Sequence, residues 1–203
     1  MEITTGSSFS QSAQDQFVLK ALDYKINGYF LEIGSNHPIN INNSYILEKQ
    51  YNWTGLMVEY ERSYEELYKT YRSSKYIIKD ARDVDYHGLF TKYNFPKNMD
   101  YLQIDLEVTN GSTIETLEVL NKTIFPEYTF SVVTFEHDIY VGDHYNTRNR
   151  SREIFKNNGY VLFYSNVKNH DCEYEDWYIH SSLNKDFPKG DSIDYSEIIK
   201  LME

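Results

Sequence analysis

The sequence predicts an α/β fold in which a mostly parallel sheet is covered by helices on both faces. Short apolar runs of strand length alternate regularly with amphipathic runs of helix length, and this alternation is typical of strand–helix–strand units. The strand-like runs are nearly continuous in apolar residues, as expected for strands that are buried on both faces of a parallel sheet.

The first elements are predicted from residue periodicity. Apolar residues at helical spacing predict a helix over 14–24, and the run Tyr-Phe-Leu-Glu-Ile predicts a strand over 29–33. A short helix over 44–50 and a strand over 56–58 follow. Ser63 and Glu66 have the spacing of a capping box, which predicts a helix over 63–72 that begins at Ser63.

The remaining elements continue the alternation. Helices are predicted over 113–120 and 148–157, and the second should end at Asn158-Gly159, a common C-cap sequence. Further strands are predicted over 76–78, 101–104, 130–135, 160–164 and 177–179.

We expect one domain over residues 1–203, because nothing in the sequence indicates a linker or an internal repeat. Its parts would be an N-terminal helix at about 14–24, a core at about 28–180 and a C-terminal extension at about 181–203. The apolar residues at 198, 199 and 201 suit a terminal helix that docks on the core.

The composition excludes several classes of partner. A formal net charge of −11 argues against nucleic acid, because binding to phosphate backbones depends on Lys and Arg. No run approaches the roughly 18 apolar residues of a membrane span. Residues 1–5 lack the basic and apolar regions of a secretory leader. The single cysteine, Cys172, excludes an internal disulfide. We therefore expect a cytoplasmic protein.

Two predicted strands end at residues that suit a nucleoside. The strand over 29–33 leads into Gly34, where the lack of a side chain lets the backbone approach a ligand. The strand over 56–58 leads into Glu59, a carboxylate that could accept hydrogen bonds from both hydroxyls of a ribose. A mere strand-capping role for Glu32 and Glu59 is less favoured, because carboxylates beside apolar strands usually have a partner.

The turn after the first of these strands indicates which nucleoside fits. Gly34-Ser-Asn-His-Pro38 contains one glycine, whereas a dinucleotide site needs G-x-G-x-x-G and a P-loop needs Gly-Lys-Ser/Thr. S-adenosylmethionine (SAM) is a nucleoside without phosphates, and it therefore fits this turn better than a dinucleotide or a nucleoside triphosphate.

Eight short segments occur in the same order as in FkbM-type methyltransferases, and the chain resembles that family over about residues 11–180. The segments are Gln14-Asp15-x-Phe17-Val18, Gly28-Tyr-Phe-Leu-Glu-Ile-Gly34, Asn43-Ser-Tyr-x-Leu-Glu48, Trp53-x-Gly-Leu-x-Val-Glu59, Tyr101-Leu-Gln-Ile-Asp-Leu-Glu107, Phe135-Glu-His137, Asn158-Gly-Tyr160 and Asp176-Trp-Tyr178. Any one of them would be a weak match alone.

The resemblance implies a Rossmann-like, seven-stranded class I methyltransferase fold. It also implies methyl transfer from SAM to a hydroxyl oxygen of a sugar, a glycoconjugate or another small molecule. The chain could then be one domain of a larger glycan-modifying protein. The resemblance places the methionine part of SAM at Glu32, Gly34 and Ser35, the ribose at Glu59 and the adenine near Asp80 and Ala81. The further cofactor contacts that it implies are Gln14, Asn36, Tyr60 and Asp105.

The chain departs from the family pattern at two places. His37-Pro38 stands where the family often carries Asp-Gly. The family's Asp-x-Glu-Gly-x-Glu becomes Asp105-x-Glu107-Val-Thr-Asn-Gly111, in which the glycine is displaced and Glu115 is the candidate for the third acid.

An alcohol needs a general base or a metal before it attacks a methyl group. The candidate catalytic residues are Asp105 and Glu107 after one strand, and His137 after the next. His137 is predicted as the base because imidazole titrates near neutrality and Glu136 could orient it. Alternatively, Asp105, Glu136 and His137 could bind Mg²⁺ or Mn²⁺.

Two other functions stay open at the level of sequence. The altered Asp-x-Glu-Gly segment would suit a noncatalytic nucleoside-binding module of the same fold. A nucleotide-dependent oxidoreductase is disfavoured by the missing glycines and by the lack of a Tyr-x-x-x-Lys motif.

Overall fold

Helices and strands alternate along the chain in the computed structural model, which describes residues 8–142 and 144–202. The strands are β1 (Tyr29–Ile33), β2 (Thr54–Glu59), β3 (Lys75–Ile78), β4 (Asn98–Ile104), β5 (Thr129–Glu136), β6 (Tyr160–Asn169), β7 (Cys172–His180) and β8 (Gly190–Asp191). The α-helices are α1 (Gln14–Ala21), α2 (Tyr45–Tyr51), α3 (Glu65–Tyr71), α4 (Tyr86–Lys92), α5 (Ser112–Thr123), α6 (Tyr145–Asn157) and α7 (Tyr195–Leu201), and 3₁₀ turns lie at Arg62–Tyr64, Ala81–Asp83 and Ser181–Leu183.

The strands form one sheet in the order β3-β2-β1-β4-β5-β7-β6-β8. The first five strands of this order are parallel, and β7 is antiparallel to both of its neighbours. The predicted α/β class with a mostly parallel sheet is therefore confirmed. The sheet has one strand more than the seven predicted, because the two-residue β8 pairs with β6.

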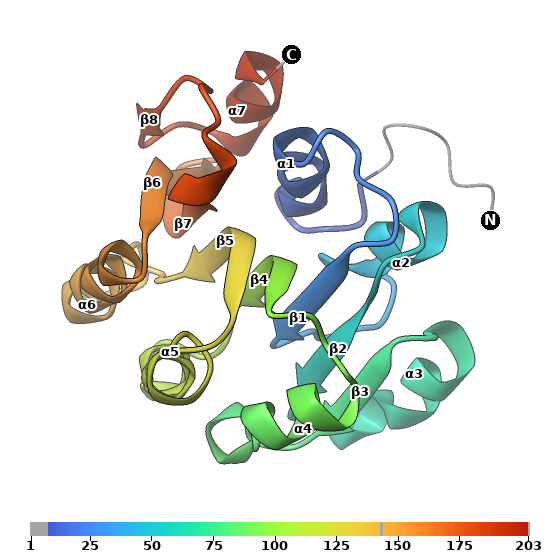
Figure 1. Ribbon diagram of the computed structural model, residues 1–203. Coiled ribbons are helices and arrows are strands. Elements are labelled where there is room, and N and C mark those ends of the chain that lie inside the picture. Colours follow the sequence, from blue (N-terminus) through green and yellow to red (C-terminus); the bar gives the residue numbers. More distant parts are fainter. Residues whose placement is uncertain (1–7, 143, 203) are drawn as a thin grey trace.

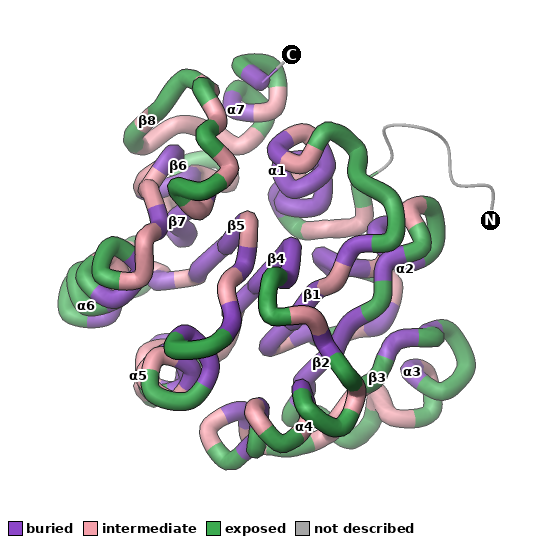
Figure 2. The backbone as a smooth tube through the Cα atoms, in the orientation of Figure 1, coloured by how far each residue is buried: buried purple, intermediate pink, exposed green. Residues whose placement is uncertain are grey.

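Helices cover both faces of the sheet (Figure 1). The face of α1, α2, α3 and α7 has a core that contains Phe17, Leu47 and Ile198. The opposite face, covered by α4, α5 and α6, has a second core that contains Phe90 and Leu117. Figure 2 shows that α1 and the central strands are largely buried, whereas much of α4 and α6 is exposed. The central strands therefore form the rigid base on which their end residues are presented.

Several predicted element boundaries are corrected by the structure. The capping box at Ser63 does not form, because the preceding turn is capped by the Glu61 carboxylate, which accepts a hydrogen bond from Ser63 N at 3.1 Å. Glu66 instead pairs with Lys69 at 2.6 Å. The helix predicted over 14–24 ends at Ala21, and the backbone is left-handed at residues 23 and 24.

Helix α4 was not predicted, because it is only seven residues long and contains Gly88, a residue that disfavours helices. Its start is nevertheless a typical cap, since the Asp85 carboxylate accepts a hydrogen bond from Gly88 N at 2.9 Å. The terminal helix expected near 198–201 is present as α7, and Ile198 is fully buried.

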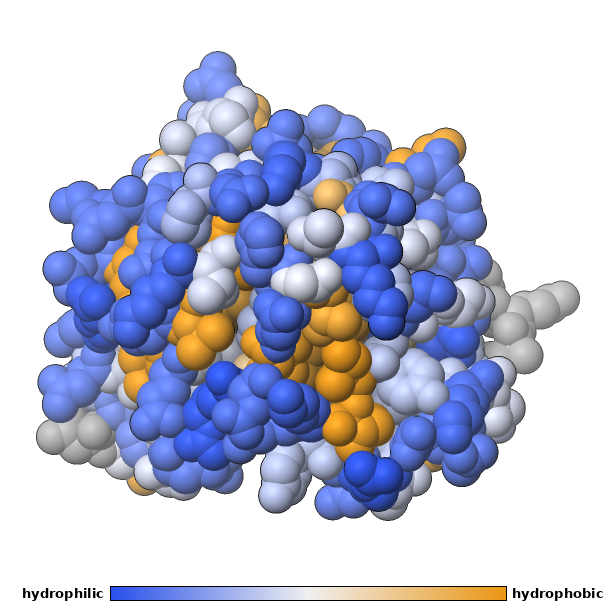
Figure 3. All heavy atoms as spheres, turned by 60° about the horizontal axis from the view of Figure 1, so that its bottom comes forward, coloured by the Kyte–Doolittle hydropathy of each residue, from blue (hydrophilic) through white to orange (hydrophobic). Residues whose placement is uncertain are grey.

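The surface at the α4 end of the molecule is largely hydrophilic, with hydrophobic side chains in several patches between the hydrophilic ones (Figure 3). Within residues 8–142 and 144–202, no helix combines the length and the apolar character that crossing a membrane requires. Residues 1–5, on which the expectation about a secretory leader rests, lie outside the described residues.

Candidate functional site

A cavity of about 540 Å³ lies at the carboxyl ends of β1, β2, β4 and β5. Ligands of open α/β sheets bind at these strand ends. The cavity reaches Gly34, Glu59, Asp105 and Glu136, which follow or end the four strands. The structure therefore brings these four residues to one cavity. Carboxylates dominate the lining, which includes Glu59, Glu61, Asp105, Glu107, Glu136 and Asp138.

The turn after β1 is held tightly against two neighbouring strands. Gly34 has φ +78°, and a Cβ atom there would overlap the carbonyl oxygen of Asp105. Gly34 N also donates to Val58 O at 2.9 Å. Only glycine fits this conformation and this contact together. The His37-Pro38 sequence continues the turn, since His37 Nδ1 accepts hydrogen bonds from the backbone amides of residues 39 and 40 at 3.1 Å each.

Glu59 connects the two loops that border the β2 side of the cavity. One carboxylate oxygen accepts from Asn36 N at 2.6 Å, and the other accepts from Glu61 N at 2.7 Å. A carboxylate offers about four lone-pair positions, so each oxygen keeps capacity for one more donor. Glu59 is about nine-tenths buried, and it lines the cavity. The carboxylate is therefore fixed in place and can still bind a diol.

A second hollow of about 300 Å³ continues the cavity beyond Glu59. The two spaces share Tyr60, Leu106 and Glu107, and the hollow is lined further by Asp80 and Ala81. The Asp80 carboxylate is paired with Arg82 at 2.7 Å, and hydrogen bonds from Arg82 lower the pKa of Asp80 to about 2. The apolar atoms here suit a nucleobase, in the position predicted for adenine.

Three predicted cofactor residues, Glu32, Ser35 and Gln14, are not part of the cavity lining, and their role in binding stays a prediction. Glu32 is buried and accepts from Asn43 N at 2.8 Å and from Ser44 Oγ at 2.5 Å. Burial raises the pKa of Glu32 to about 7, against the opposing charge of Arg72. Ser35 is buried and bonds with Tyr68 at 2.7 Å.

Gln14 is the third of these residues. Its side-chain amide donates to the buried Glu175 at 3.0 Å and to the Tyr174 hydroxyl at 3.1 Å. Gln11, from the segment just before α1, lines the cavity instead. The N-terminal segment therefore does reach the cavity, but the residue that lines it is Gln11 and not the predicted Gln14.

Arg72 fixes the loop that forms one wall of the cavity. Its side chain is fully buried, and it donates to Pro38 O at 3.2 Å, to Asn42 Oδ1 at 2.9 Å and to Ser44 Oγ at 2.7 Å. Its Nε also bonds to Glu48 at 3.2 Å. Burial alone would raise the pKa of Glu48, but Arg72 and nearby hydrogen bonds lower it to about 2. The Arg72 side chain therefore holds the loop that contains Pro38 and Asn42 in place.

We expect Arg72→Ala to lower the free energy of unfolding by about 3–5 kcal/mol, because it removes the fully buried cation beside Glu48 and leaves only the partly exposed Lys49, at 3.0 Å, as its partner. Urea unfolding would measure this loss. Arg62→Ala is the matched control, since the Arg62 side chain is 81% exposed and lies 3.8 Å from Glu65, and it should change stability by less than about 0.5 kcal/mol. Similar losses in the two variants would contradict this role for Arg72.

Three carboxylates converge at the ends of β4 and β5. Asp105 and Glu136 share a hydrogen bond, and burial raises the pKa of both. The charge of Asp105 raises the pKa of Glu136 further. Asp138 also lines the cavity, and burial raises its pKa against the opposing effect of a hydrogen bond with Glu136. Carboxyls whose pKa is raised in a cavity are candidates for general acid–base catalysis.

The backbone at the end of β5 explains why Asp138 reaches the cavity. His137 N and Asp138 N both donate to Tyr174 O, at 2.7 and 3.1 Å, and Asp138 has a left-handed backbone with φ +48°. The chain therefore turns sharply after Glu136. A non-glycine residue in this conformation is uncommon, and such residues occur often at functional sites.

The same turn removes His137 from the predicted site. His137 is fully buried, is not part of the cavity lining, and its Nε2 lies 3.4 Å from Asp176 Oδ1. Asp176 is also bound by Arg152 at 2.7 Å. Side chains alternate along a strand, so Glu136 faces the cavity and His137 faces away from it. The structure therefore does not place His137 as a base beside a ligand in the cavity.

The predicted ligand set of Asp105, Glu136 and His137 is not brought together. In the described part of the chain, no group of three or more His, Cys, Asp or Glu side chains has an arrangement suited to a metal ion. Glu107 lines the cavity as predicted, but Glu115 pairs with Arg82 at 3.0 Å and is not part of the lining.

Sequence reasoning missed several residues of the cavity wall, among them Gln11, Ile41 and Tyr64. They lie in loops or turns, where no periodicity indicates which side chain faces the site. Asn43 was quoted only as part of a motif, although it lines the cavity. Its place just before the helix predicted over 44–50 is the sequence feature that could have indicated a role for this polar residue.

No family model and no curated protein sequence matches this chain. Solved structures resemble it at low sequence identity. A methyltransferase from Pyrococcus furiosus is 13% identical, with a TM-score of 0.56, and the alignment covers 88% of this chain and 87% of that one. An O-methyltransferase from Bacillus cereus in complex with SAH (S-adenosylhomocysteine) is 10% identical, with a TM-score of 0.56, and the alignment covers 86% of this chain and 84% of that one. A precorrin-6y C5,15-methyltransferase from Geobacter metallireducens is 14% identical, with a TM-score of 0.52, and the alignment covers 87% of this chain and 93% of that one. The chain has a Rossmann-like methyltransferase fold.

Proposed function

We propose that this chain is a SAM-dependent O-methyltransferase that acts on a hydroxyl group of a sugar or glycoconjugate, as its resemblance to FkbM-type enzymes implies. The observation that carries the proposal is the continuous space from the one-glycine turn at Gly34, past Glu59, to the hollow beside Ala81. This space has the order of contacts that a methionine chain, a ribose and an adenine need. The fold, shared with solved methyltransferases, supports it.

The residues present fit this cofactor. Glu59 would accept the ribose hydroxyls, and Tyr60 and Leu106 border both the ribose and the adenine spaces. The absence of a side chain at Gly34 leaves room for the methionine part. SAM carries a positive charge on sulfur, and a lining rich in carboxylates favours a cation over a phosphorylated nucleotide.

When bound, SAM supplies an electrophilic methyl group, and the protein has to align an acceptor oxygen with it. Alignment alone can be worth about 7–11 kcal/mol. Asp105, Glu136 and Asp138 border the cavity beside Gly34 and are placed to accept the proton that the acceptor hydroxyl loses. A carboxyl with a raised pKa is a stronger base than an ordinary carboxylate. These acids take the role that the sequence assigned to His137.

We expect Glu59→Ala to weaken the binding of SAM by about tenfold or more, because charge-assisted hydrogen bonds contribute about 1.5–3 kcal/mol each. Titration calorimetry with SAM would measure the change. Glu66→Ala is the control, since the Glu66 side chain is 82% exposed on α3, and its affinity should match that of the wild type. Unchanged affinity in Glu59→Ala would remove this residue from the site.

Two measurements separate the proposed activity from the alternatives. Binding of SAM without binding of NAD in the calorimeter would argue against an oxidoreductase. Conversion of SAM to SAH in the presence of a sugar acceptor would argue against a noncatalytic module. SAM binding without turnover over a broad panel of hydroxyl acceptors would contradict the proposed activity.

A further inference from the structure

Residues 8–12 form a strap at the cavity, and a buried carboxylate holds this strap in place. Asp15, in the first turn of α1, is fully buried, and its carboxylate accepts hydrogen bonds from Ser8 Oγ at 2.7 Å and from Phe9 N at 2.8 Å. Gln16 N donates to the same carboxylate at 2.8 Å. Burial raises the pKa of Asp15, and the hydrogen bonds oppose this shift. Because a buried carboxylate is costly without donors, Asp15 and the strap stabilise each other.

One part of the strap is fixed to the cavity wall that contains Gly34. Phe9 O accepts from Asn42 N at 2.9 Å, and the ring of Phe9 packs against that of Tyr45, with 4.8 Å between the ring centroids. The Asn42 side chain in turn donates to Ser35 O at 2.9 Å, in the turn that follows β1. The strap is therefore connected through Asn42 to the turn that the proposed function assigns to the methionine part of SAM.

The other part of the strap is fixed to β7, beside the acids of β5. Gln14 Oε1 accepts from Ser12 N at 2.8 Å, and Gln14 Nε2 donates to the buried carboxylate of Glu175 at 3.0 Å. Glu175 is paired with Glu136 between β5 and β7, and directly opposed residues have their side chains on the same face of a sheet. The strap therefore reaches from the turn after β1 to the strand pair that carries Glu136.

Gln11 lies between these two anchors. It is exposed, and among the residues of the strap it alone is part of the cavity lining. The order of the strands at the cavity is β2, β1, β4 and β5, so a strap anchored at the β1 turn and beside β5 lies away from Glu59, which ends β2. In the proposed function, on which this inference rests, Glu59 holds the ribose. The methionine part of SAM then lies on the side of Gln11.

The methionine part of SAM carries an α-carboxylate, which needs hydrogen-bond donors. The first two backbone amides of the turn after β1 are occupied, because Gly34 N and Ser35 N both donate to Val58 O, at 2.9 and 3.2 Å. No described residue of the lining is Lys, Arg or His. The side-chain amide of a glutamine carries two donors, and Gln11 brings such an amide to the cavity.

We propose that the side-chain amide of Gln11 donates a hydrogen bond to the α-carboxylate of SAM, and that Gln14 and Asp15 are positioning residues that act through Gln11 by holding the strap. Gln14 is 1% exposed and is not part of the lining, so its effect on the cofactor is indirect. The direct contact that the family resemblance implies at Gln14 passes to Gln11. The strap thereby favours a cofactor that carries the carboxylate.

The test compares SAM with decarboxylated SAM, which lacks only the α-carboxylate. Calorimetry measures the affinity of the full chain for each ligand. Gln11→Ala should weaken the binding of SAM by about tenfold, because a hydrogen bond to a charged group is lost, and should leave the affinity for decarboxylated SAM unchanged. Gln50→Ala is the matched control, since Gln50 is exposed on α2 and is not part of the lining, and it should bind both ligands as the wild type does. Equal losses for both ligands, or an unchanged affinity for SAM, in Gln11→Ala would overturn the proposal.

A double-mutant cycle tests the positioning role. Asp15→Asn and Gln14→Ala should each weaken the binding of SAM more than that of decarboxylated SAM. Combined with Gln11→Ala, neither should weaken SAM further, because residues that act through one contact are not additive. A general loosening of the fold would instead weaken both ligands and would add to the effect of Gln11→Ala. Additive losses would therefore contradict the positioning role of Gln14 and Asp15.

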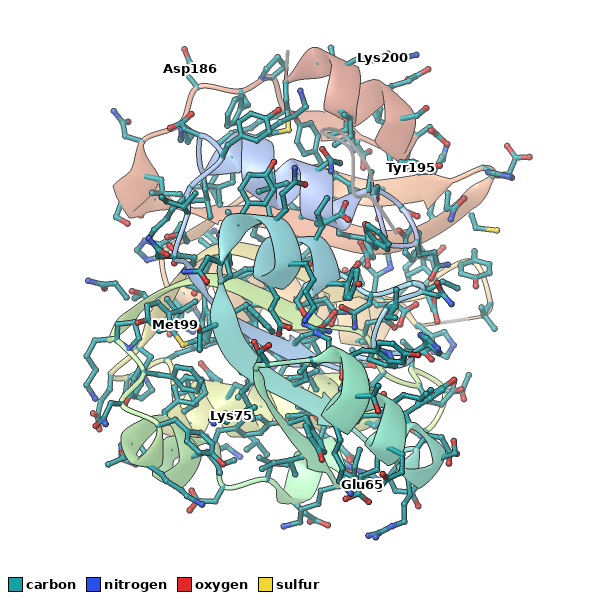
Figure 4. The ribbon with its side chains drawn as sticks, turned by 90° about the vertical axis from the view of Figure 1, so that its right-hand side faces the viewer. Glu65, Lys75, Met99, Asp186, Tyr195 and Lys200 are labelled. Carbon is teal, nitrogen blue, oxygen red and sulfur yellow. The ribbon has the colours of Figure 1, made fainter. Side chains whose placement is uncertain are left out.

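Asp186→Asn is the control for Asp15→Asn, because Asp186 is exposed, is not part of the cavity lining and points away from the body of the molecule (Figure 4). It should leave both affinities unchanged. Circular dichroism checks that each variant is folded. Ser8→Ala removes one donor to Asp15 at an exposed residue, so it tests the strap even where the variants of buried residues unfold. A selective loss of SAM affinity in Ser8→Ala supports the proposal, and an unchanged affinity contradicts it.

The wild type separates a failure of this inference from a failure of the proposed function. If the wild type binds SAM but Gln11→Ala shows no selective loss, the role of Gln11 is refuted and the proposed function stands. If the wild type binds neither SAM nor SAH, the proposed function is refuted, and the role of Gln11 with it.

Discussion

Gly34→Ala is expected to lower the free energy of unfolding by more than about 4 kcal/mol, a loss that only severe local conflicts produce. Two effects add. The backbone at Gly34 has φ +78°, which costs an L-residue about 1–2 kcal/mol. The new methyl group would also overlap the backbone oxygen of Asp105, and a backbone atom cannot move aside as a side chain can. The ends of β1 and β4 would have to separate.

Gly111→Ala provides the control for the first effect alone. Gly111 has φ +79°, but the atom nearest to an added Cβ there is Glu115 Oε1 at 3.4 Å, which is the end of a flexible side chain. We expect this variant to lose only about 1–2 kcal/mol. Urea unfolding of both variants, followed by circular dichroism, measures the difference. Equal losses would show that the contact with Asp105 is unimportant.

The strands could be predicted because their cause is local in the sequence. Tyr29–Ile33 is an apolar run of strand length, and the structure has the strand over the same residues. Gly34 and Glu59 were placed correctly for the same reason, since they directly follow or end such runs. The carboxyl ends of parallel strands lie at one edge of a sheet, which brings these two residues together without further information.

His137 was placed wrongly because neighbouring residues at a strand end face opposite sides, so Glu136 and His137 cannot both reach the cavity, and because the sharp turn after Glu136 was not predicted from the sequence. The left-handed residue after it, Asp138, brings the acid and not the imidazole to the cavity. Glu32 posed a similar problem, since the sequence did not indicate that its carboxylate would be occupied by Asn43 and Ser44. Tertiary partners decided both cases.

The acids of β4 and β5 give the second large effect that we expect. Asp105→Asn and Glu136→Gln should each reduce kcat by about 10²–10⁴-fold, the range for loss of a general base. Glu136→Gln should leave SAM affinity in the calorimeter close to that of the wild type. Full kcat in both variants would contradict the assignment of the base to this pair.

The pH dependence of kcat provides a more specific test of the same pair. Burial raises the pKa of Asp105 and Glu136, and the base has to be ionised to accept a proton. Wild-type activity should therefore be lost as the pH falls, at a pH above the ordinary carboxyl value of about 4. The two groups titrate as a pair, so the profile reports apparent values of the pair. Because the charge of Asp105 raises the pKa of Glu136, the residual activity of Asp105→Asn should persist to lower pH than that of the wild type. A shift of this profile to higher pH would show that the two carboxyls do not interact as the structure indicates.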